Sequence, residues 1–333
     1  MAIRRPRVTV IGSLNMDISV TVPSLPGPGV TVLGSSARFS PGGKGGNQAV
    51  AASRLGAEVR MVGCVGDDAF GHQLLADLQK EHVATDHVRV IQGTPSGLAM
   101  IAVDSSAENL IVVAPGANHE VSRADVEAAL SAPTDVLVIS AEIPVPAITA
   151  ALIHPSAALR ILNLAPVPPG AAAITADRLD WLVVNESEAA ALLNNPGRTP
   201  VSPTPTDREP EPDPAADPPD GALQAAAQAA QALVTQGARH AVVTAGAHGA
   251  AVAGPEGTHT IPGFKVQAVD TVGAGDTFVG ALAVALAVGI PPREAVRAAA
   301  AAGAAAVTRP GAQTAMPRPP DILSTTGLKW PET

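Results

Sequence analysis

Short apolar segments alternate with longer segments of helical composition along most of the chain, and this alternation limits the possible folds more than any other feature. The apolar segments are VTVIG, VRMVGCVG, DVLVIS, LRILNL, WLVVN and HAVVTAG, each with the length and continuity of a buried parallel strand. The helical segments cover residues 47–56, 68–82, 122–131 and 222–237. The alternation predicts an α/β fold: a doubly wound, mostly parallel sheet with helices on both of its faces.

Residues 18–40 and 95–113 depart from this alternation. Apolar and polar residues alternate there between proline and glycine turns, a pattern typical of antiparallel strands. We expect the two regions to pair as a small β-sheet that projects from the main sheet as a lid. One apolar face of this lid would be exposed unless it covered a ligand or a second subunit.

A third region, residues 194–221, holds nine prolines and six acidic residues. This composition buries too little apolar surface to offset the entropy of ordering, so we predict a disordered surface insert. A linker between two domains is the alternative, but helix and strand segments resume after the region. We therefore interpret residues 1–333 as a single α/β domain that carries the lid and the insert.

Composition narrows the classes of partner and the cellular location. The formal net charge is −9 and the isoelectric point is near 5.3. These values argue against a nucleic-acid or anionic-membrane surface, because both require clustered lysine and arginine. The alanine-rich stretch 281–307 is interrupted by prolines and charged residues, so it does not predict a membrane span. Cys64 is the only cysteine, which excludes an intramolecular disulfide and fits a soluble protein of the reducing cytoplasm.

The segment DTVGAGDTFVG places three small residues before an acidic one. An apolar helix begins just after Asp276, so Gly273, Ala274 and Gly275 should form its first turn. Unpaired amides and the positive end of the helix dipole bind anions at such a turn. Asp276 is then either a helix-capping acid or a general base that accepts a proton from an attacking hydroxyl. The small residues favour the general base, because capping alone does not require them.

Two further polar clusters lie near predicted helix starts and strand ends. Lys44 and Asn47 lie in PGGKGGNQA at the mouth of a helix, where they offer directional donors to hydroxyl groups. This cluster has neither the Walker A pattern nor dinucleotide-binding spacing, and a flexible glycine turn is the alternative interpretation. Asn15 and Asp17 lie in GSLNMD beyond the first predicted strand, where ligands bind in open α/β sheets. An Asx turn is the alternative there.

Seven segments, in this order and spacing, resemble the ribokinase branch of the PfkB family of carbohydrate kinases. They are GSLNMD, PGGKGGNQA, AENLIVVAPGAN, VVNESE, TAGAHG, VDTVGAGDTF and VTRPGAQ. The resemblance runs over nearly the whole chain apart from the proline-rich insert. The resemblance implies a β lid that pairs with the lid of a partner in a homodimer. It also implies transfer of the γ-phosphate of ATP to the 5-hydroxyl of D-ribose, with Mg²⁺ and a monovalent cation, usually K⁺.

The same resemblance implies roles for individual residues. Asp276 would be the general base, and the small residues before it would form an anion hole. The sugar would be bound by Asn15, Asp17, Gly43, Lys44, Asn47, Glu142 and Asp276. The nucleotide would be bound by Asn185, Thr244, Gly246, Gly249 and Gly275.

The resemblance further implies metal ions on the nucleotide side. Glu188 stands with Asn185 in an NxxE pattern that the family associates with Mg²⁺ and phosphate placement. Because Mg²⁺ commonly keeps several waters, Glu188 is expected to act directly or through water. The K⁺ ligands would come from Asp270, Val272, Ala306, Arg309, Gly311 and Ala315. Ala315 departs from the family pattern, in which a serine often contributes at that position.

Alternatives to a ribose kinase stay open at this point. A kinase of the same family that acts on 2-deoxyribose, a nucleoside or a ketose would use the same helix tip, although the GGKG form favours ribose over fructose. A noncatalytic sugar-binding regulator on the same fold would bind ribose without turning over ATP. The intact Asp276, anion hole and NxxE pair favour an enzyme.

Overall fold

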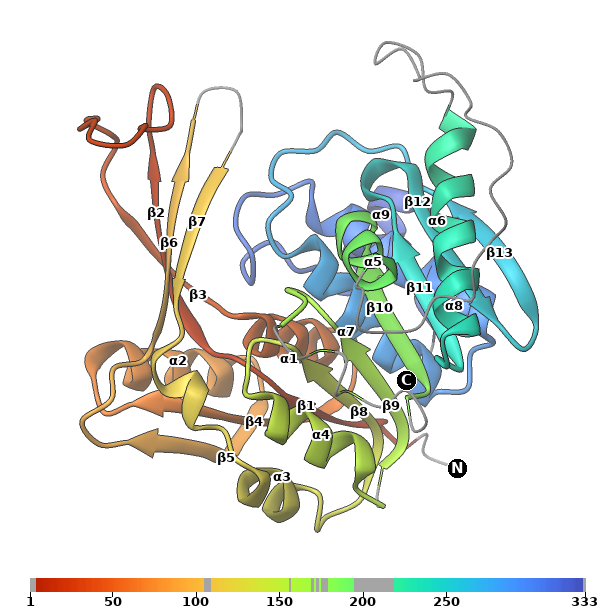
Figure 1. Ribbon diagram of the computed structural model, residues 1–333, viewed down its shortest axis with the longest axis horizontal. Helices are drawn as coiled ribbons and strands as arrows, with labels where there is room; N and C mark the ends of the chain where they lie inside the picture. Colours follow the sequence, from red (N-terminus) through yellow and green to blue (C-terminus); the bar gives the residue numbers. More distant parts are fainter. Residues whose placement is uncertain are drawn as a thin grey trace.

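The computed structural model describes residues 4–104, 109–155, 157–168, 171, 174, 179–194 and 219–331. A nine-stranded sheet forms its centre (Figure 1). In spatial order the strands are β13 (Gly257–Pro262), β12 (Gly249–Gly254), β11 (His240–Thr244), β10 (Trp181–Asn185), β9 (Ala157–Asn163), β8 (Thr134–Ser140), β1 (Arg7–Ile11), β4 (Glu58–Gly66) and β5 (Val83–Ile91). The strands from β11 to β5 pair in parallel, while β12 and β13 are antiparallel. The predicted mostly parallel sheet is therefore confirmed.

The central strands are apolar on both faces, which explains why helices cover both. Val8 and Val10 of β1 pack into one core cluster, whereas Ile11 packs into a second cluster on the opposite face. The helices of the first face are α1 (Lys44–Arg54), α2 (Ala69–Lys80), α7 (Ala274–Ala287), α8 (Pro292–Ala306) and α9 (Pro319–Thr326). Those of the second face are α3 (Arg123–Ala129), α4 (Val145–Ile153), α5 (Glu186–Leu193) and α6 (Pro219–Thr235). Within the described ranges, no helix has the length and apolarity needed to cross a membrane.

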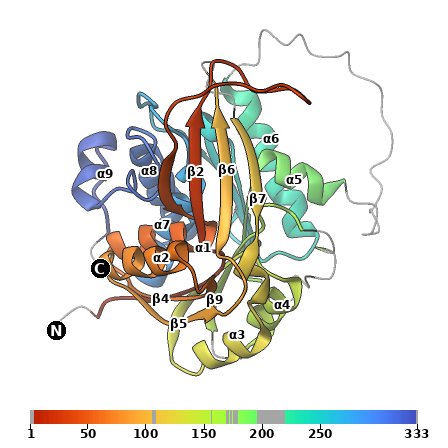
Figure 2. The ribbon, with the colours of Figure 1, turned by 90° about the vertical axis from the view of Figure 1, so that its left-hand side faces the viewer.

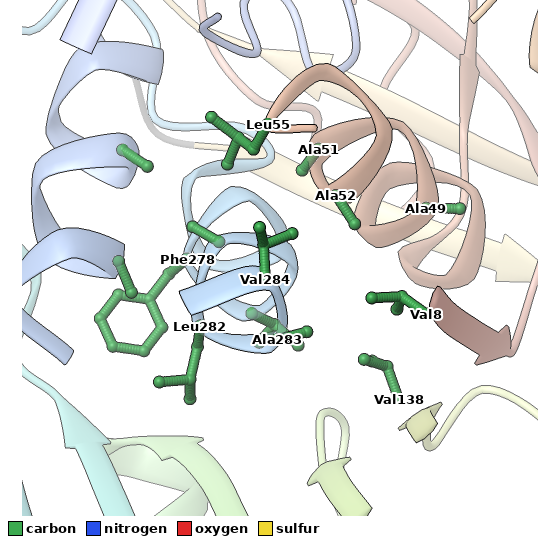
Figure 3. Close-up of a cluster of buried hydrophobic side chains, with 14 of the residues drawn as sticks. Val8, Ala49, Ala51, Ala52, Leu55, Val138, Phe278, Leu282, Ala283 and Val284 are labelled. Atoms are coloured by element: carbon green, nitrogen blue, oxygen red, sulfur yellow. The ribbon is translucent and has the colours of Figure 1, made fainter. Parts of the chain in front are cut away.

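Helices α1 and α7 pack closely against each other, and each begins with one of the glycine-rich motifs. Gly280 of α7 permits the close approach, because a Cβ there would lie 2.7 Å from the carbonyl oxygen of Gln48 in α1. Figure 3 shows Ala51 and Ala52 of α1 in the same buried cluster as Val284 of α7. This packing brings the first turns of the two helices together.

A second sheet projects from the main one, in the order β3 (Arg38–Gly42), β2 (Asn15–Thr21), β6 (Gly97–Val103) and β7 (Asn109–Ala114) (Figure 2). This sheet is the predicted lid. Its outer pairs are antiparallel as expected, but the central pair of β2 and β6 is parallel. The expectation of antiparallel pairing was wrong there, because the α/β elements between the two strands return the chain to its starting edge, so both strands leave in the same direction.

Residues 30–37 also differ from the prediction, which treated them as part of a strand. Strand β3 begins only at Arg38. The side chains of Val30 and Leu33 are 58% and 89% exposed, so burial does not fix a register for this stretch. Ser35 N donates to Thr21 O at 2.8 Å, but no ladder with β2 continues along it in the described chain.

Most of the predicted proline-rich insert, residues 195–218, lies outside the described residues. The described chain resumes in α6 at Pro219, three residues before the predicted helix at 222. Residues 105–108 of the second lid segment also lie outside the described residues. The insert and the interpretation of residues 1–333 as one domain stay predictions.

Candidate active site

The N-termini of α1 and α7 meet beyond the carboxyl ends of the parallel strands, and the polar motif residues converge there. Gly43 precedes α1 with φ of 81°, and Gly273 precedes α7 with φ of 75°. Both conformations favour glycine. A Cβ at Gly43 would also lie 2.7 Å from the backbone nitrogen of Asn15. Glycine therefore allows the start of α1 to contact the loop that follows β1.

Asp276 lies in the first turn of α7 and is 7% exposed. Asn47 Nδ2 donates to Asp276 Oδ2 at 2.9 Å, and Gln48 Nε2 donates to Asp276 Oδ1 at 3.1 Å. The N-cap position of the helix is Gly273, and the Asp276 carboxylate bonds side chains of α1 instead of amides of its own helix. This geometry does not support the alternative interpretation of Asp276 as a helix-capping acid.

Charged groups on three other elements surround the same point. Burial, together with the negative charges of Glu142 and Asp276, raises the pKa of Asp17 to about 7. Ser13 Oγ donates to Glu142 Oε2 at 2.5 Å, and Lys44 N donates to the same oxygen at 3.3 Å. Burial would lower the pKa of Lys44, but nearby carboxylates outweigh it and raise that pKa above its usual value. Buried and half-buried donors and acceptors of both charges suit a ligand with several hydroxyl groups.

Asn15 is oriented by Asn118, a residue that the sequence analysis did not select. Asn118 Nδ2 donates to Asn15 Oδ1 at 2.7 Å, and Asn118 Oδ1 accepts from Leu14 N at 2.8 Å. Asn118 lies in the short helix η1 (Gly116–Glu120) and is buried. The arrangement leaves the Nδ2 group of Asn15 without a recorded partner in the described chain. Asn118 is the last residue of AENLIVVAPGAN, one of the seven segments that resemble the family, so that resemblance could have identified it as a site residue.

Gln48 and Asn163 are also buried beside Asp276 and were not predicted as site residues. Gln48 follows Asn47 directly and opens the apolar part of α1. Asn163 ends an apolar strand, which is the same positional signal that selected Asn15. Applied to every strand end, that signal would have found Asn163.

The first turn of α7 presents unpaired amides to open space. The helical hydrogen bonds begin with Thr277 N, which donates to Gly273 O at 2.8 Å, so the amides of Gly275 and Asp276 precede them. Ala274 N is bonded within the preceding turn. A Cβ at Gly275 would meet no atom within 4 Å. An anion can therefore approach these amides without a steric obstacle.

A cavity of about 540 Å³ lies beside this helix tip. Four predicted nucleotide-binding residues line it, namely Thr244, Gly246, Gly249 and Gly275. The rest of the wall is mostly glycine, alanine and valine with Phe264 and Phe278, and Lys265 supplies one charge. Its size and apolar lining suit a nucleoside-sized ligand. Asn185 is not among the lining residues.

Asn185 and Glu188 form a capping box at the start of α5. Glu188 N donates to Asn185 Oδ1, and Asn185 N donates to Glu188 Oε2, both at 2.8 Å. Burial raises the pKa of Glu188, while the Asn185 amide and the charge of Lys44 oppose this shift. Asp276 raises the pKa further, so Glu188 is electrostatically part of the same site. The NxxE pattern thus has a structural role whatever else it does.

Asp270 connects two loops that contain the predicted K⁺ ligands. Val272 N donates to Asp270 Oδ1 at 3.0 Å, and Gly311 N donates to Asp270 Oδ2 at 2.8 Å. The other predicted ligands lie at the end of α8 and in the loop after it: Ala306, Arg309 and Ala315. Neither Val272 nor Ala315 has a polar side-chain atom, so ligands at these positions would be backbone carbonyls.

Comparison with known proteins gives a consistent result. A model described as pfkB family carbohydrate kinase matches residues 5–319. Ribokinase of Bacillus subtilis is 38% identical over 314 residues, which cover 93% of this chain and 96% of that protein. Ribokinase of Schizosaccharomyces pombe is 35% identical over 337 residues, which cover 97% and 98%. The structure of Arabidopsis thaliana ribokinase complexed with ribose and ATP is similar with a TM-score of 0.76 and 28% identity, covering 96% of this chain and 98% of that one.

Proposed function

This chain belongs to the pfkB family of carbohydrate kinases, and we propose that it transfers the γ-phosphate of ATP to the 5-hydroxyl of D-ribose. The observation that carries the proposal is the position of Asp276. Its buried carboxylate lies at the helix tip between the charged cluster of Asp17 and Lys44 and the cavity lined by Gly275. A hydroxyl bound on one side can meet a phosphate bound on the other.

In the proposed reaction, Asp276 accepts the proton of the 5-hydroxyl as its oxygen attacks the γ-phosphorus. The bond between the γ-phosphorus and the bridging oxygen breaks, and ADP leaves with that oxygen. The amides of Gly275 and Asp276 stabilise the negative charge on the transferred group, because they point out of the helix N-terminus. The products are ribose 5-phosphate, ADP and a proton.

The sugar would be held by Asn15, Asp17, Gly43, Lys44, Asn47, Glu142 and Asp276. Each buried polar group that lacks a partner would disfavour a ligand with a missing hydroxyl. Asn47 Oδ1 is buried with no partner in the described chain, so a sugar hydroxyl can satisfy it. This support for a polyol does not depend on the relatives.

ATP would occupy the cavity beside α7, with its terminal phosphate at Gly275 and Asn185 near the phosphates. A single carboxylate from the protein is enough to hold Mg²⁺ here, because this ion prefers oxygen ligands and takes most of them from phosphates and water. Glu188 Oε1 has no recorded partner in the described chain, so it is available directly or through water. Mg²⁺ would neutralise phosphate charge when it is bound.

A monovalent cation such as K⁺ would be held by carbonyl oxygens of the two loops joined by Asp270. The described chain records no hydrogen bond to the carbonyls of Asp270, Val272, Arg309 and Gly311, whereas Ala306 O accepts from Arg309 N at 3.3 Å. Free carbonyls suit such an ion. The ion would fix these loops next to the start of α7.

We also infer a homodimer formed through the lid. One face of the lid is apolar and solvent-exposed, and we call Ile18, Phe39, Met100, Leu110 and Val112 the apolar lid face. Three of these side chains are 46 to 59% exposed in the single chain: Phe39, Met100 and Val112. A partner lid would cover them. In analytical ultracentrifugation we expect the wild-type protein to sediment as a dimer and Met100→Glu as a monomer. A wild-type monomer would contradict the inferred homodimer.

A cytoplasmic location agrees with the state of the lone thiol. Burial raises the pKa of Cys64 to about 12, so the thiol is protonated and unreactive at neutral pH. The location remains our proposal from composition.

The test of the proposed function is a coupled assay of ADP release with Mg²⁺, with and without K⁺. We expect the highest kcat/KM with D-ribose among ribose, 2-deoxyribose, fructose and a set of nucleosides. Preference for another compound would assign the chain to a different substrate of the same family. Ribose binding without ATP turnover under all conditions would instead indicate a noncatalytic regulator.

A further inference from the structure

A chain of buried amide side chains connects the backbone of β10 to the Asp276 carboxylate. Asn163 Nδ2 donates to the carbonyl oxygen of Val183 at 3.1 Å. Gln48 Nε2 donates to Asn163 Oδ1 at 3.0 Å and to Asp276 Oδ1 at 3.1 Å. Three elements, β10, β9 and α1, are thus linked in series to the first turn of α7.

The donor and the acceptor of each hydrogen bond in this series are fixed by the Val183 carbonyl oxygen at its start. A backbone carbonyl can only accept, so the NH₂ group of Asn163 must point at Val183 and its oxygen at Gln48. Gln48 must then present its NH₂ group to that oxygen. The second hydrogen of the same NH₂ group is left for Asp276, which therefore receives a donor and never an amide oxygen.

Gln48 occupies this buried position although its side-chain oxygen has no hydrogen-bond partner in the described chain. The side chain is fully buried, and its Oε1 has no partner among the described residues. An unpaired buried acceptor destabilises a folded protein, and an apolar side chain of similar size would avoid this loss. The benefit must lie with the two hydrogens that Gln48 donates.

We infer that Gln48, oriented by Asn163, is a positioning residue that holds the Asp276 carboxylate in one orientation toward the sugar hydroxyl. This inference rests on the proposed function, in which Asp276 is the general base. Asn47 donates to the other oxygen, Oδ2, but it is also assigned to the sugar. Gln48 has no such second task, so Asp276 keeps one fixed donor whether or not a sugar is bound.

Charged groups of both signs face Asp276 from other elements. Asp17 on β2 and Glu188 on α5 carry negative charge, and Lys44 on α1 carries positive charge. Glu142, after β8, adds negative charge beside Asp17 and Lys44. A fixed amide donor holds one carboxylate oxygen of Asp276 in place without adding a charge of its own.

The first test is Gln48→Met, which keeps the size of the side chain and removes its donors. We expect kcat to fall by about 10- to 100-fold, as for a reacting group that is misplaced by a fraction of an ångström. The KM for ribose should change much less, because the side chains assigned to the sugar are all retained. Gln48→Glu, which exchanges the donor for a carboxylate of the same shape, should lower kcat at least as much, because it places an acceptor where Asp276 needs a donor.

A matched control lies on the same helix. Ser53 is 9% exposed, and its hydroxyl donates to Glu81 O at 2.7 Å, away from Asp276. Ser53→Ala should lower the melting temperature and leave kcat and the KM for ribose nearly unchanged. If Gln48→Met behaves like Ser53→Ala, with lower stability and an unchanged kcat, then Gln48 has a structural role only and the inference is wrong.

A double-mutant cycle tests whether Asn163 acts through Gln48. Asn163→Leu should lower kcat in the wild-type background and have little further effect in Gln48→Met, because residues of one network are not additive. Equal effects of Asn163→Leu on kcat in both backgrounds would show that Asn163 does not act through Gln48. If both Gln48 variants fail to fold, Asn163→Leu is tested alone, and an unchanged kcat in that variant would contradict the inference. Failure of the proposed function is distinct, because the wild-type protein would then show no sugar-dependent ADP release.

Discussion

The two proposed halves of the candidate active site present different groups to a ligand. On the proposed sugar side, side chains with charge or amide groups converge, among them the buried Asp17 and Asn47 and the half-buried Lys44. On the nucleotide side, a cavity of about 540 Å³ has walls of mostly glycine, alanine and valine, and backbone amides at Gly275. The proposed sugar side would therefore be specific through side-chain chemistry, whereas the proposed nucleotide side would depend on shape and on the main chain.

This difference has an energetic consequence. Burying Asp17 next to Glu142 and Asp276 destabilises the ligand-free protein, because its carboxylate loses water without gaining a cation of its own. Small residues around the nucleotide cavity carry no such cost. Substitutions on the proposed sugar side should therefore stabilise the ligand-free protein and weaken its function at the same time.

Asp276→Asn changes the residue at the boundary of the two proposed halves and should give the largest effect. We expect kcat to fall by about 10²- to 10⁴-fold, because the general base is lost, while ribose still binds. Turnover and isothermal titration of ribose would measure the two effects. Asp125→Asn is the control, since Asp125 is a first-turn helix acid that does cap its helix. Near wild-type turnover in Asp276→Asn would remove this residue from the mechanism.

Asp17→Asn tests the sugar half alone. We expect the KM for ribose to rise by about 10- to 100-fold through loss of charged hydrogen bonds, with the KM for ATP nearly unchanged. The ribose kcat/KM of the wild type should fall as the pH drops through about 7, where Asp17 becomes protonated, and the variant should lack this dependence. A wild-type profile that is flat around pH 7 would contradict the assignment.

The same variant should also be more stable. The folded pKa of Asp17 is raised from 3.8 to about 7, so folding loses stability as the pH rises through this interval. Asp17→Asn should therefore raise the melting temperature at pH 8 and have no such effect below about pH 4. A lower melting temperature at pH 8 would show that the carboxylate stabilises the fold.

Gly275→Ala tests the nucleotide half alone. The added methyl group meets no protein atom within 4 Å, so the fold should be retained and the methyl should project into the proposed phosphate site. We expect the KM for ATP to rise by about tenfold, equivalent to roughly 1.4 kcal/mol, while ribose binding is unchanged. Gly27→Ala, also in open space but in the lid, is the control. Unchanged ATP kinetics would place the phosphates elsewhere.

Ala315→Ser tests the proposed cation site and should give the smallest effect. Its side chain is fully buried beside the loop of Gly311, and a hydroxyl would add one ligand. We expect the K⁺ concentration for half-maximal activation to fall by about threefold, as for one added hydrogen-bond-strength interaction. Activity that is independent of K⁺ in both proteins would rule out the cation site.

The sequence predicted the strands at the centre of the sheet better than those toward its edges, for physical reasons. Strands buried on both faces, such as β1 and β8, have uninterrupted apolar segments, whereas β5 at the sheet edge alternates polar and apolar residues in VATDHVRVI and was not recognised. Strands β12 and β13 are rich in glycine, alanine and threonine and gave no strand signal either. Strands β5 and β13 lie at the two edges of the sheet and expose part of their residues, so their composition resembles that of loops. Strand β12 is buried between β13 and β11, but its glycine and alanine residues are uncommon in strands.

Among site residues, those next to glycine motifs were found, and those that act through other side chains were missed. Asp276 and Lys44 are single polar residues in unusual small-residue surroundings. Asn118 and Asn163 lie far from these motifs in the sequence, and only the fold brings them beside Asn15 and Gln48. The link that Asp270 makes between two loops is equally invisible, because Gly311 is 41 residues away.

Strand β2 belongs to both the site and the lid. Its first three residues, Asn15 to Asp17, are buried at the sugar side, and its last residues reach the exposed sheet. Strand β2 would therefore connect the proposed sugar pocket with the surface that a partner lid would cover. A rigid strand shared by two sites means that, if the proposed dimer forms, the partner lid would contact the same element that presents Asn15 and Asp17 to the sugar.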